Sequence, residues 1–155
     1  ILKGKKPTYS IAQNELNIVG IAAGTLVGGN LALIYALLGT TYSFNFKDKI
    51  LFIEDIGENF YALDRMLISL DLAGVFRNIK GLIIGGMTNM GDEKDNKSYE
   101  ESFDQFAYKI ISERVSKYDF PVAFGFPNGH IHDNRPLMIG ANITMNVAEK
   151  VIIEF

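Results

Sequence analysis

The residues best suited to chemistry lie in an acidic run and in a loop that carries both histidines. Glu54 and Asp55 directly follow the apolar residues 50–53, and they open the run Glu54-Asp55-Ile56-Gly57-Glu58. A carboxylate at this place can orient a histidine, act as a base or ligate a metal. We expect Glu54 to be partly buried, and a buried carboxylate needs a partner. A purely structural role stays open, because acids also favour the N-terminus of a following helix.

His130 and His132 are the two histidines of the chain, and both lie in the segment 126–133. Histidine is the usual general base near neutral pH, and Pro127 and Gly129 give this loop an irregular backbone that could aim a ring. Two other interpretations remain. The histidines could be ordinary surface residues, or His130 and His132 could bind a metal together with Glu54.

Two further motifs favour structural roles. The amides of Gly28-Gly29-Asn30 could hold an anion or line an oxyanion site, but the motif matches neither a dinucleotide fingerprint nor a P-loop. A tight turn followed by an Asn30 N-cap is favoured there, and Asp64-Arg65 suggests a solvated ion pair. No serine lies in a Gly-x-Ser-x-Gly elbow, so a Ser-His-acid enzyme is not completed by this chain alone.

The elements that must position these residues follow from hydrophobic periodicity and capping signals. Buried strands are predicted at 16–22, 50–53, 79–84 and 121–126, short strands at 42–46 and 137–139, and a hairpin at 141–145 and 151–155. Helices are predicted at 31–38, at about 59–73 and after a Ser98–Glu101 capping box, with a surface loop at 89–97. This order predicts an α/β domain with a parallel part and an antiparallel tail. Ligands of such sheets bind beyond the carboxyl ends of strands, where Glu54 and His130 are expected.

Composition narrows the class of protein. The chain has 155 residues, of which 48% are hydrophobic and 21% charged, as expected for one globular domain. A net charge of −3 gives no electrostatic case for binding nucleic acid or an anionic membrane, and no apolar run approaches the ~20 residues of a membrane span. Without cysteine there is no disulfide, thiolate zinc site or cysteine nucleophile. We expect residues 1–6 to be a linker that enters the domain, and part of an active site to lie upstream.

Three segments in this order resemble a known family. They are 27–31 with Leu38-Gly39-Thr40, then 50–55 continued by Glu58, Tyr61, 64–67 and Ala73-Gly74, and finally Phe126-Pro127-Asn128-Gly129-His130 followed by 136–140. Together they resemble the C-terminal domain of the LD-carboxypeptidase family. Members of this family are serine peptidases of the murein tetrapeptide carboxypeptidase and microcin-immunity type. The resemblance extends from about Gly20 to Gly140.

The resemblance implies an α/β fold, namely a swivelling β/β/α domain with a mixed sheet and about three helices, covering residues 1–155. The nucleophilic serine would belong to an N-terminal α/β domain absent from this chain. Glu54 and His130 match the glutamate and histidine of the family's Ser-His-Glu triad, with Glu58 as a second candidate for the acid. No role follows for His132, and no cofactor or metal is expected.

The implied activity of the full protein is hydrolysis of an amide bond next to a free C-terminal carboxylate. The usual substrate is a murein tetrapeptide, which loses its terminal D-alanine during cytoplasmic cell-wall recycling, and members are commonly homodimers. Three alternatives stay open: a microcin-immunity-type hydrolase acting on an acyl-sulfamoyl aminoacyl nucleotide, a binding domain without catalysis, and a metal-dependent hydrolase. The triad predicts that Glu54 and His130 lie within hydrogen-bond reach.

Overall fold

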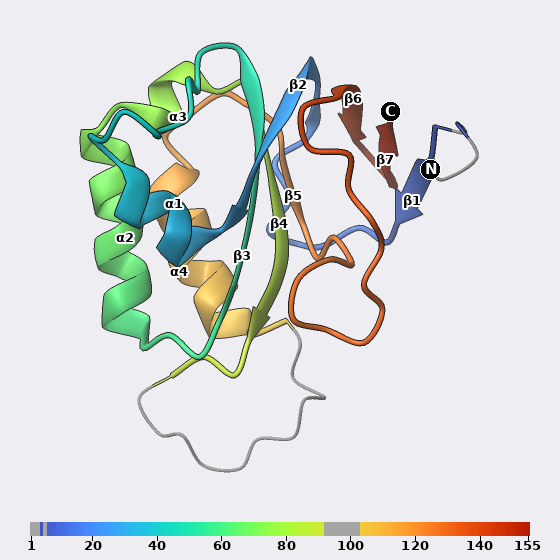
Figure 1. Cartoon of the computed structure of the whole chain (residues 1–155). Coiled ribbons are helices and arrows are strands. Elements are labelled where there is room, and N and C mark those ends of the chain that lie inside the picture. The colour runs from blue at the N-terminus through green and yellow to red at the C-terminus, as the bar shows by residue number, and fades with distance from the viewer. Residues whose placement is uncertain (1–3, 5, 92–102) are drawn as a thin grey trace.

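The computed structural model describes residue 4, residues 6–91 and residues 103–155, and in them the fold is built on a seven-stranded mixed sheet. The strands are β1 (Thr8–Ile11), β2 (Gly20–Asn30), β3 (Lys49–Ile56), β4 (Gly81–Thr88), β5 (Val122–Phe124), β6 (Asn142–Val147) and β7 (Val151–Glu154), in the spatial order β1-β7-β6-β2-β3-β4-β5. The helices are α1 (Leu31–Leu37), α2 (Phe60–Leu72), α3 (Val75–Asn78) and α4 (Gln105–Val115), and they cover one face of the sheet (Figure 1).

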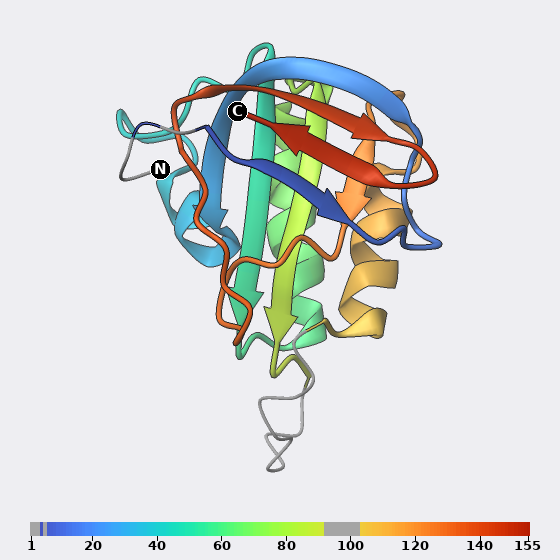
Figure 2. The same cartoon turned by 90° about the vertical axis from the view of Figure 1, so that its right-hand side faces the viewer.

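The long strand β2 joins the parallel and antiparallel parts of the sheet. Its second half, from Thr25 to Asn30, pairs in parallel with β3, and its first half, from Gly20 to Thr25, pairs antiparallel with β6. Figure 2 shows that β6, β7 and β1 cross in front of β3 and β4, on the side away from the helices. The molecule therefore has two β layers and one helical layer, which confirms the predicted β/β/α fold with a parallel part and an antiparallel tail.

The two faces of β3 contribute to different cores. Leu51 and Ile53 pack into the cluster under the helices, whereas Ile50 and Phe52 pack into the cluster between the two β layers. Successive side chains of a strand point to opposite faces. The same alternation, continued past Ile53, sends the next two side chains of β3 to opposite sides of the sheet.

Several predicted ends of elements are confirmed. The Asn30 side chain caps α1 by accepting a hydrogen bond from Leu33 N at 3.1 Å. Helix α2 is followed by Gly74 at φ +78°, a left-handed conformation that ends helices. Helix α4 differs from the prediction, because it begins only after Asp104, whose carboxylate caps it, and Phe103 precedes the helix. The predicted Ser98–Glu101 capping box and residues 92–97 of the predicted loop lie outside the described residues.

Other local predictions were wrong. No turn separates β2 from α1: Gly28 and Gly29 belong to the strand, and a Cβ on Gly28 would lie 1.9 Å from Phe52 O, so the two backbones meet closely there. Segment 42–46 is not a strand, because its aromatic side chains do not alternate across a sheet; Phe44 and Phe46 both pack against the helical core. Strand β1 was missed; it begins at Thr8, directly after the predicted linker.

Two more local predictions were wrong. Residues 137–139 form no strand, and the neighbouring Gly140 N instead donates to Leu26 O at 2.8 Å. The Asp64–Arg65 ion pair is absent, because Asp64 accepts two hydrogen bonds from Arg114 of α4 and Arg65 lies over the ring of Tyr61. No helix in the described part of the chain is long and apolar enough to cross a membrane.

Candidate active site

A β-bulge lies beside Glu54, close to the end of β3. Ile53 pairs with Ile84 but Asp55 pairs with Met87, so Gly85 and Gly86 of β4 together stand opposite Glu54. Because of this bulge, main-chain groups of both glycines form hydrogen bonds to residues outside the β3–β4 pair. The buried hydroxyl of Tyr108 donates to Gly85 O at 2.8 Å from the helical side, and Gly86 N donates to Asn128 O at 2.9 Å on the other side. The bulge thus fastens the loop that contains Asn128 to the sheet.

That loop, residues 125–141, runs across the carboxyl ends of β3 and β4 (Figure 2) and is held by its own hydrogen bonds. The side chain of Asn128 donates to Arg135 O at 2.6 Å, and Arg135 N donates to Pro127 O at 2.7 Å, which closes the segment 127–135. The buried Thr88 donates its hydroxyl to His130 O at 3.1 Å. His130 is therefore carried by a loop with fixed attachments to β4.

Glu54 and His130 meet directly. His130 Nδ1 lies 2.9 Å from Glu54 Oε2, although 76 positions separate them, and this confirms the predicted contact. The Glu54 side chain is 8% exposed and the His130 side chain 51% exposed. Because a carboxylate only accepts hydrogen bonds, the contact puts a proton on Nδ1 and leaves the lone pair of Nε2 free to accept another.

Gly129 permits this approach. A Cβ added to it would lie 2.8 Å from Glu54 Oε2 and 3.0 Å from Glu54 Cβ. Its φ of +119° is also a conformation that side-chain-bearing residues rarely adopt. A residue without a side chain is therefore needed immediately before His130.

Asp55, the next residue of β3, faces the helical layer instead. Its carboxylate accepts hydrogen bonds from Asn30 Nδ2 at 2.9 Å, Ala32 N at 3.1 Å and Ile56 N at 2.9 Å. Burial raises the pKa of Asp55 above its usual value, and the charge of Glu58 adds to this, while the three donors act in the opposite direction. The acid that contacts His130 is Glu54, whereas Glu58 accepts a hydrogen bond from Gly91 N through its main-chain carbonyl.

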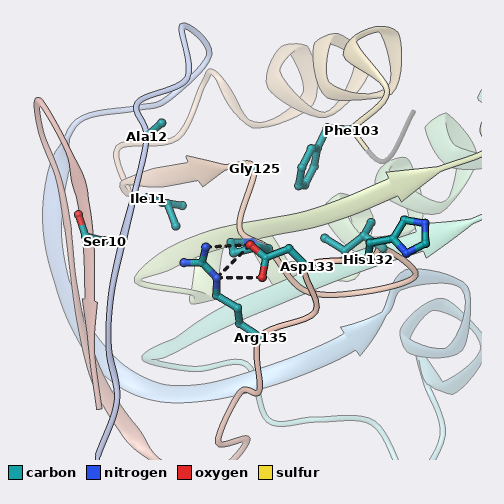
Figure 3. Close-up of a pocket in the computed structure, with 10 residues that line it drawn as sticks. Ser10, Ile11, Ala12, Phe103, Gly125, His132, Asp133 and Arg135 are labelled. Atoms are coloured by element: carbon teal, nitrogen blue, oxygen red, sulfur yellow. Dashed lines mark hydrogen bonds and ion pairs between the residues drawn. The ribbon is translucent and has the colours of Figure 1, made fainter. Parts of the chain in front are cut away.

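Two pockets flank the loop. One, of about 370 Å³, opens beside His130 and is lined by Ile56, Gly129, His130, Ile131, His132 and Asn134. The other, of about 340 Å³, lies between the loop and the end of β1, with Arg135 bound to Asp133 at 2.8 Å in its lining (Figure 3). His132 borders both pockets. Within the described ranges no three His, Asp or Glu side chains are grouped as metal ligands, so the metal-site alternative gains no support from the geometry.

The attachments of the His130 loop were not foreseen from the sequence. Neither Thr88 nor Tyr108 carries a recognisable motif, and both act on main-chain atoms of distant segments. The one available signal was the Gly85-Gly86 pair at the end of a predicted buried strand, since glycine within a strand often marks a bulge.

The family of this chain follows from its similarity to known proteins. A model of the LD-carboxypeptidase C-terminal domain matches residues 23–145. The chain belongs to the LD-carboxypeptidase family. Both members of the contacting pair, Glu54 and His130, lie within the matched part of this LD-carboxypeptidase domain.

Individual relatives agree with this assignment. A probable murein peptide carboxypeptidase of Bacillus subtilis is 35% identical over 136 residues, which are 88% of this chain and 41% of that protein. The crystal structure of muramoyltetrapeptide carboxypeptidase from Oxalobacter formigenes has a TM-score of 0.80 at 27% identity, covering 96% of this chain and 49% of that one.

A more distant neighbour shares the fold. The microcin C7 self-immunity protein MccF, solved with aspartyl sulfamoyl adenosine, has a TM-score of 0.73 at 23% identity, covering 89% of this chain and 39% of that one. The chain thus spans less than half the length of each of these three proteins.

Proposed function

We propose that this domain supplies Glu54 and His130 to a Ser-His-Glu triad. The serine would come from an N-terminal domain, and the complete enzyme would be a serine carboxypeptidase that removes the terminal D-alanine from murein tetrapeptides. The observation that carries the proposal is the 2.9 Å contact between a nearly buried carboxylate and a half-exposed imidazole. The contact supports the proposal because the acid–histidine half of a triad needs one ring nitrogen held by a carboxylate and the other available.

In this mechanism His130 Nε2 takes the proton of the serine hydroxyl as the oxygen attacks the scissile carbonyl. The imidazolium then returns the proton to the leaving amine, and water hydrolyses the remaining acyl-serine ester with His130 again acting as base. Glu54 keeps the proton on Nδ1 and stabilises the positive charge of the ring while it exists. The pocket beside His130 would hold the reacting amide, because its lining includes the His130 ring and Gly129.

The murein peptide is favoured as substrate because the two more similar relatives are named for it, at 35% and 27% identity. A second candidate is amide hydrolysis of a sulfamoyl aminoacyl nucleotide, supported by the fold shared with MccF. We further propose that the enzyme works in the cytoplasm as a homodimer, in keeping with the recycling of cell-wall peptides. Light scattering of the purified complete protein tests the dimer.

The deciding experiment compares the complete two-domain protein with the 155-residue chain. Murein tetrapeptide and aspartyl sulfamoyl adenosine are supplied in parallel, and release of D-alanine or aspartate is measured. We expect D-alanine release by the complete protein, inhibition by a serine-directed reagent, and a folded but inactive 155-residue chain. Turnover by the chain alone, or loss of activity on metal removal without inhibition by the serine reagent, would overturn the proposal.

A further inference from the structure

Thr88 stands between the strand that carries Glu54 and the loop that carries His130. It is the last residue of β4, it is 1% exposed, and it pairs with Ile56 in the β3–β4 ladder. Its main-chain carbonyl accepts a hydrogen bond from Gly57 N at 2.9 Å, while its side-chain hydroxyl donates to His130 O at 3.1 Å. A single buried residue therefore ties together the chain segments on both sides of the Glu54–His130 contact.

We propose that Thr88 is a positioning residue that sets the tautomer of His130. The inference rests on the proposed triad, but it concerns the geometry of the pair and not the chemistry. The ring of His130 is half exposed, so side-chain packing alone does not fix it. Its main chain is held on one side through Asn128 O, which accepts from Gly86 N, and at His130 itself through Thr88. Without the hydroxyl, the second attachment is lost.

The tautomer of His130 depends on the distance from its Nδ1 atom to Glu54 Oε2. Free neutral histidine exchanges its proton between the two ring nitrogens, and a hydrogen bond to one nitrogen selects the tautomer. A shift of the His130 main chain moves Nδ1 away from Glu54 Oε2, which weakens that selection. The tautomer with the proton on Nε2 cannot accept a proton from serine, so the fraction of competent enzyme falls.

The test uses Thr88→Val, which keeps the branched shape and removes the hydroxyl, and Thr88→Ser, which keeps the hydroxyl. Thr144→Val on the exposed side of β6 is the matched control for the same substitution in a strand. Nitrogen-15 chemical shifts of the His130 ring at neutral pH report the tautomer in the 155-residue chain. We expect a predominant Nδ1–H tautomer in the wild-type chain, Thr88→Ser and Thr144→Val, and a mixture of tautomers in Thr88→Val.

In the complete enzyme, kcat of Thr88→Val should fall roughly tenfold to a hundredfold with little change of KM, and Thr88→Ser should recover most of it. An unchanged tautomer in folded Thr88→Val overturns the proposal. If Thr88→Val does not fold, the wild-type chain decides: a slowly exchanging Thr88 hydroxyl proton with a nuclear Overhauser contact to residue 129 or 130 supports it, and its absence overturns it. The tautomer measurement needs no catalysis, so it stays valid even if His130→Ala shows that the triad proposal is wrong.

Discussion

Two neighbouring carboxylates at the end of β3 have opposite surroundings. Asp55 faces the helices and accepts hydrogen bonds from three donors, two of which are main-chain amides close to it in the fold. Glu54 faces the loop layer, and among the described residues its carboxylate bonds to one group, the ring of His130. Both residues are almost fully buried, with Asp55 2% exposed and Glu54 6% exposed.

Burial alone therefore does not distinguish the acid that we propose for catalysis from the acid that holds the fold. The Asp55 carboxylate accepts hydrogen bonds from fixed groups of the fold, so its surroundings indicate a structural role. A carboxylate whose partner is a half-exposed imidazole can respond when that ring takes up a proton. The difference is produced by strand alternation, which sends one acid to each face of the sheet.

The largest expected effect comes from removing the histidine. In the complete enzyme, His130→Ala should lower kcat by about 10⁴-fold or more, because the proposed general base is lost. Initial rates of D-alanine release measure this, with circular dichroism to check folding.

His132→Ala is the matched control in the same loop, and we expect its kcat to fall far less, within about tenfold, since it has no proton to move. Equal losses in two folded variants would contradict the triad. A metal site shared by both histidines would then be the better explanation, and metal analysis of the wild-type protein would test it.

The two acids themselves give the next contrast. Glu54→Gln should reduce kcat by up to about 10⁴-fold, because the amide neither fixes the tautomer as firmly nor stabilises the imidazolium. Asp55→Asn should leave kcat of the folded enzyme nearly unchanged but lower the free energy of unfolding by about 1–3 kcal/mol, because its new NH₂ group faces the Ala32 amide.

Kinetics and urea unfolding on both variants separate these effects. A loss of kcat in Asp55→Asn as large as in Glu54→Gln would remove the distinction between the two faces of β3.

Gly129→Ala tests the close approach that brings the pair together. The added methyl group would lie 2.8 Å from Glu54 Oε2, so either Glu54 or the loop must move. We expect kcat to fall roughly a hundredfold, as for a displacement of about 1 Å at an active site.

Gly125→Ala is the control, because Gly125 also has a positive φ, +80°, but no atom of the described residues lies within 4 Å of an added Cβ. Both variants should lose about 1–2 kcal/mol of stability from backbone strain. If Gly125→Ala loses as much kcat as Gly129→Ala, strain in the loop and not contact with Glu54 is responsible.

Much of the site could be predicted from the sequence because it lies where local patterns are strong. The apolar run 50–53 identifies a buried strand, its end places Glu54, and the Pro127–Gly129 irregularity identifies the loop of His130. The pairing of these two residues did not follow from periodicity; it came from the family resemblance, and the 2.9 Å contact confirms the approach it implied.

What could not be predicted depends on contacts between distant segments. The division of work between Glu54 and Asp55 requires knowing which face of β3 each occupies, and the sequence does not say which core lies on which side. The bulge at Gly85-Gly86 and its partners Tyr108 and Asn128 join residues far apart in the chain through main-chain atoms. Alternation at 42–46 predicted a strand, but Phe44 and Phe46 both pack against the helical core, and this tertiary packing overrides the local pattern.

The smallest expected effect is a pH dependence that distinguishes a buried acid from a paired one. Burial raises the pKa of Asp55 above the ordinary value of 3.8, so folding favours its protonated form. The stability it contributes is therefore fully present below pH 3.8 and is lost as pH rises through the raised pKa. The loss amounts to about 1.4 kcal/mol for each pH unit by which folding raises the pKa. The free energy of unfolding of the wild-type chain minus that of Asp55→Asn should fall with rising pH.

Asp71 should show the opposite pH dependence of stability, because hydrogen bonds from Lys117 and Tyr118 lower its pKa. For Asp71→Asn the same difference should rise as pH increases towards 3.8. Urea unfolding between about pH 3 and pH 7 measures both curves. Parallel slopes would mean that the three donors outweigh burial at Asp55, and that its carboxylate is held as a paired acid.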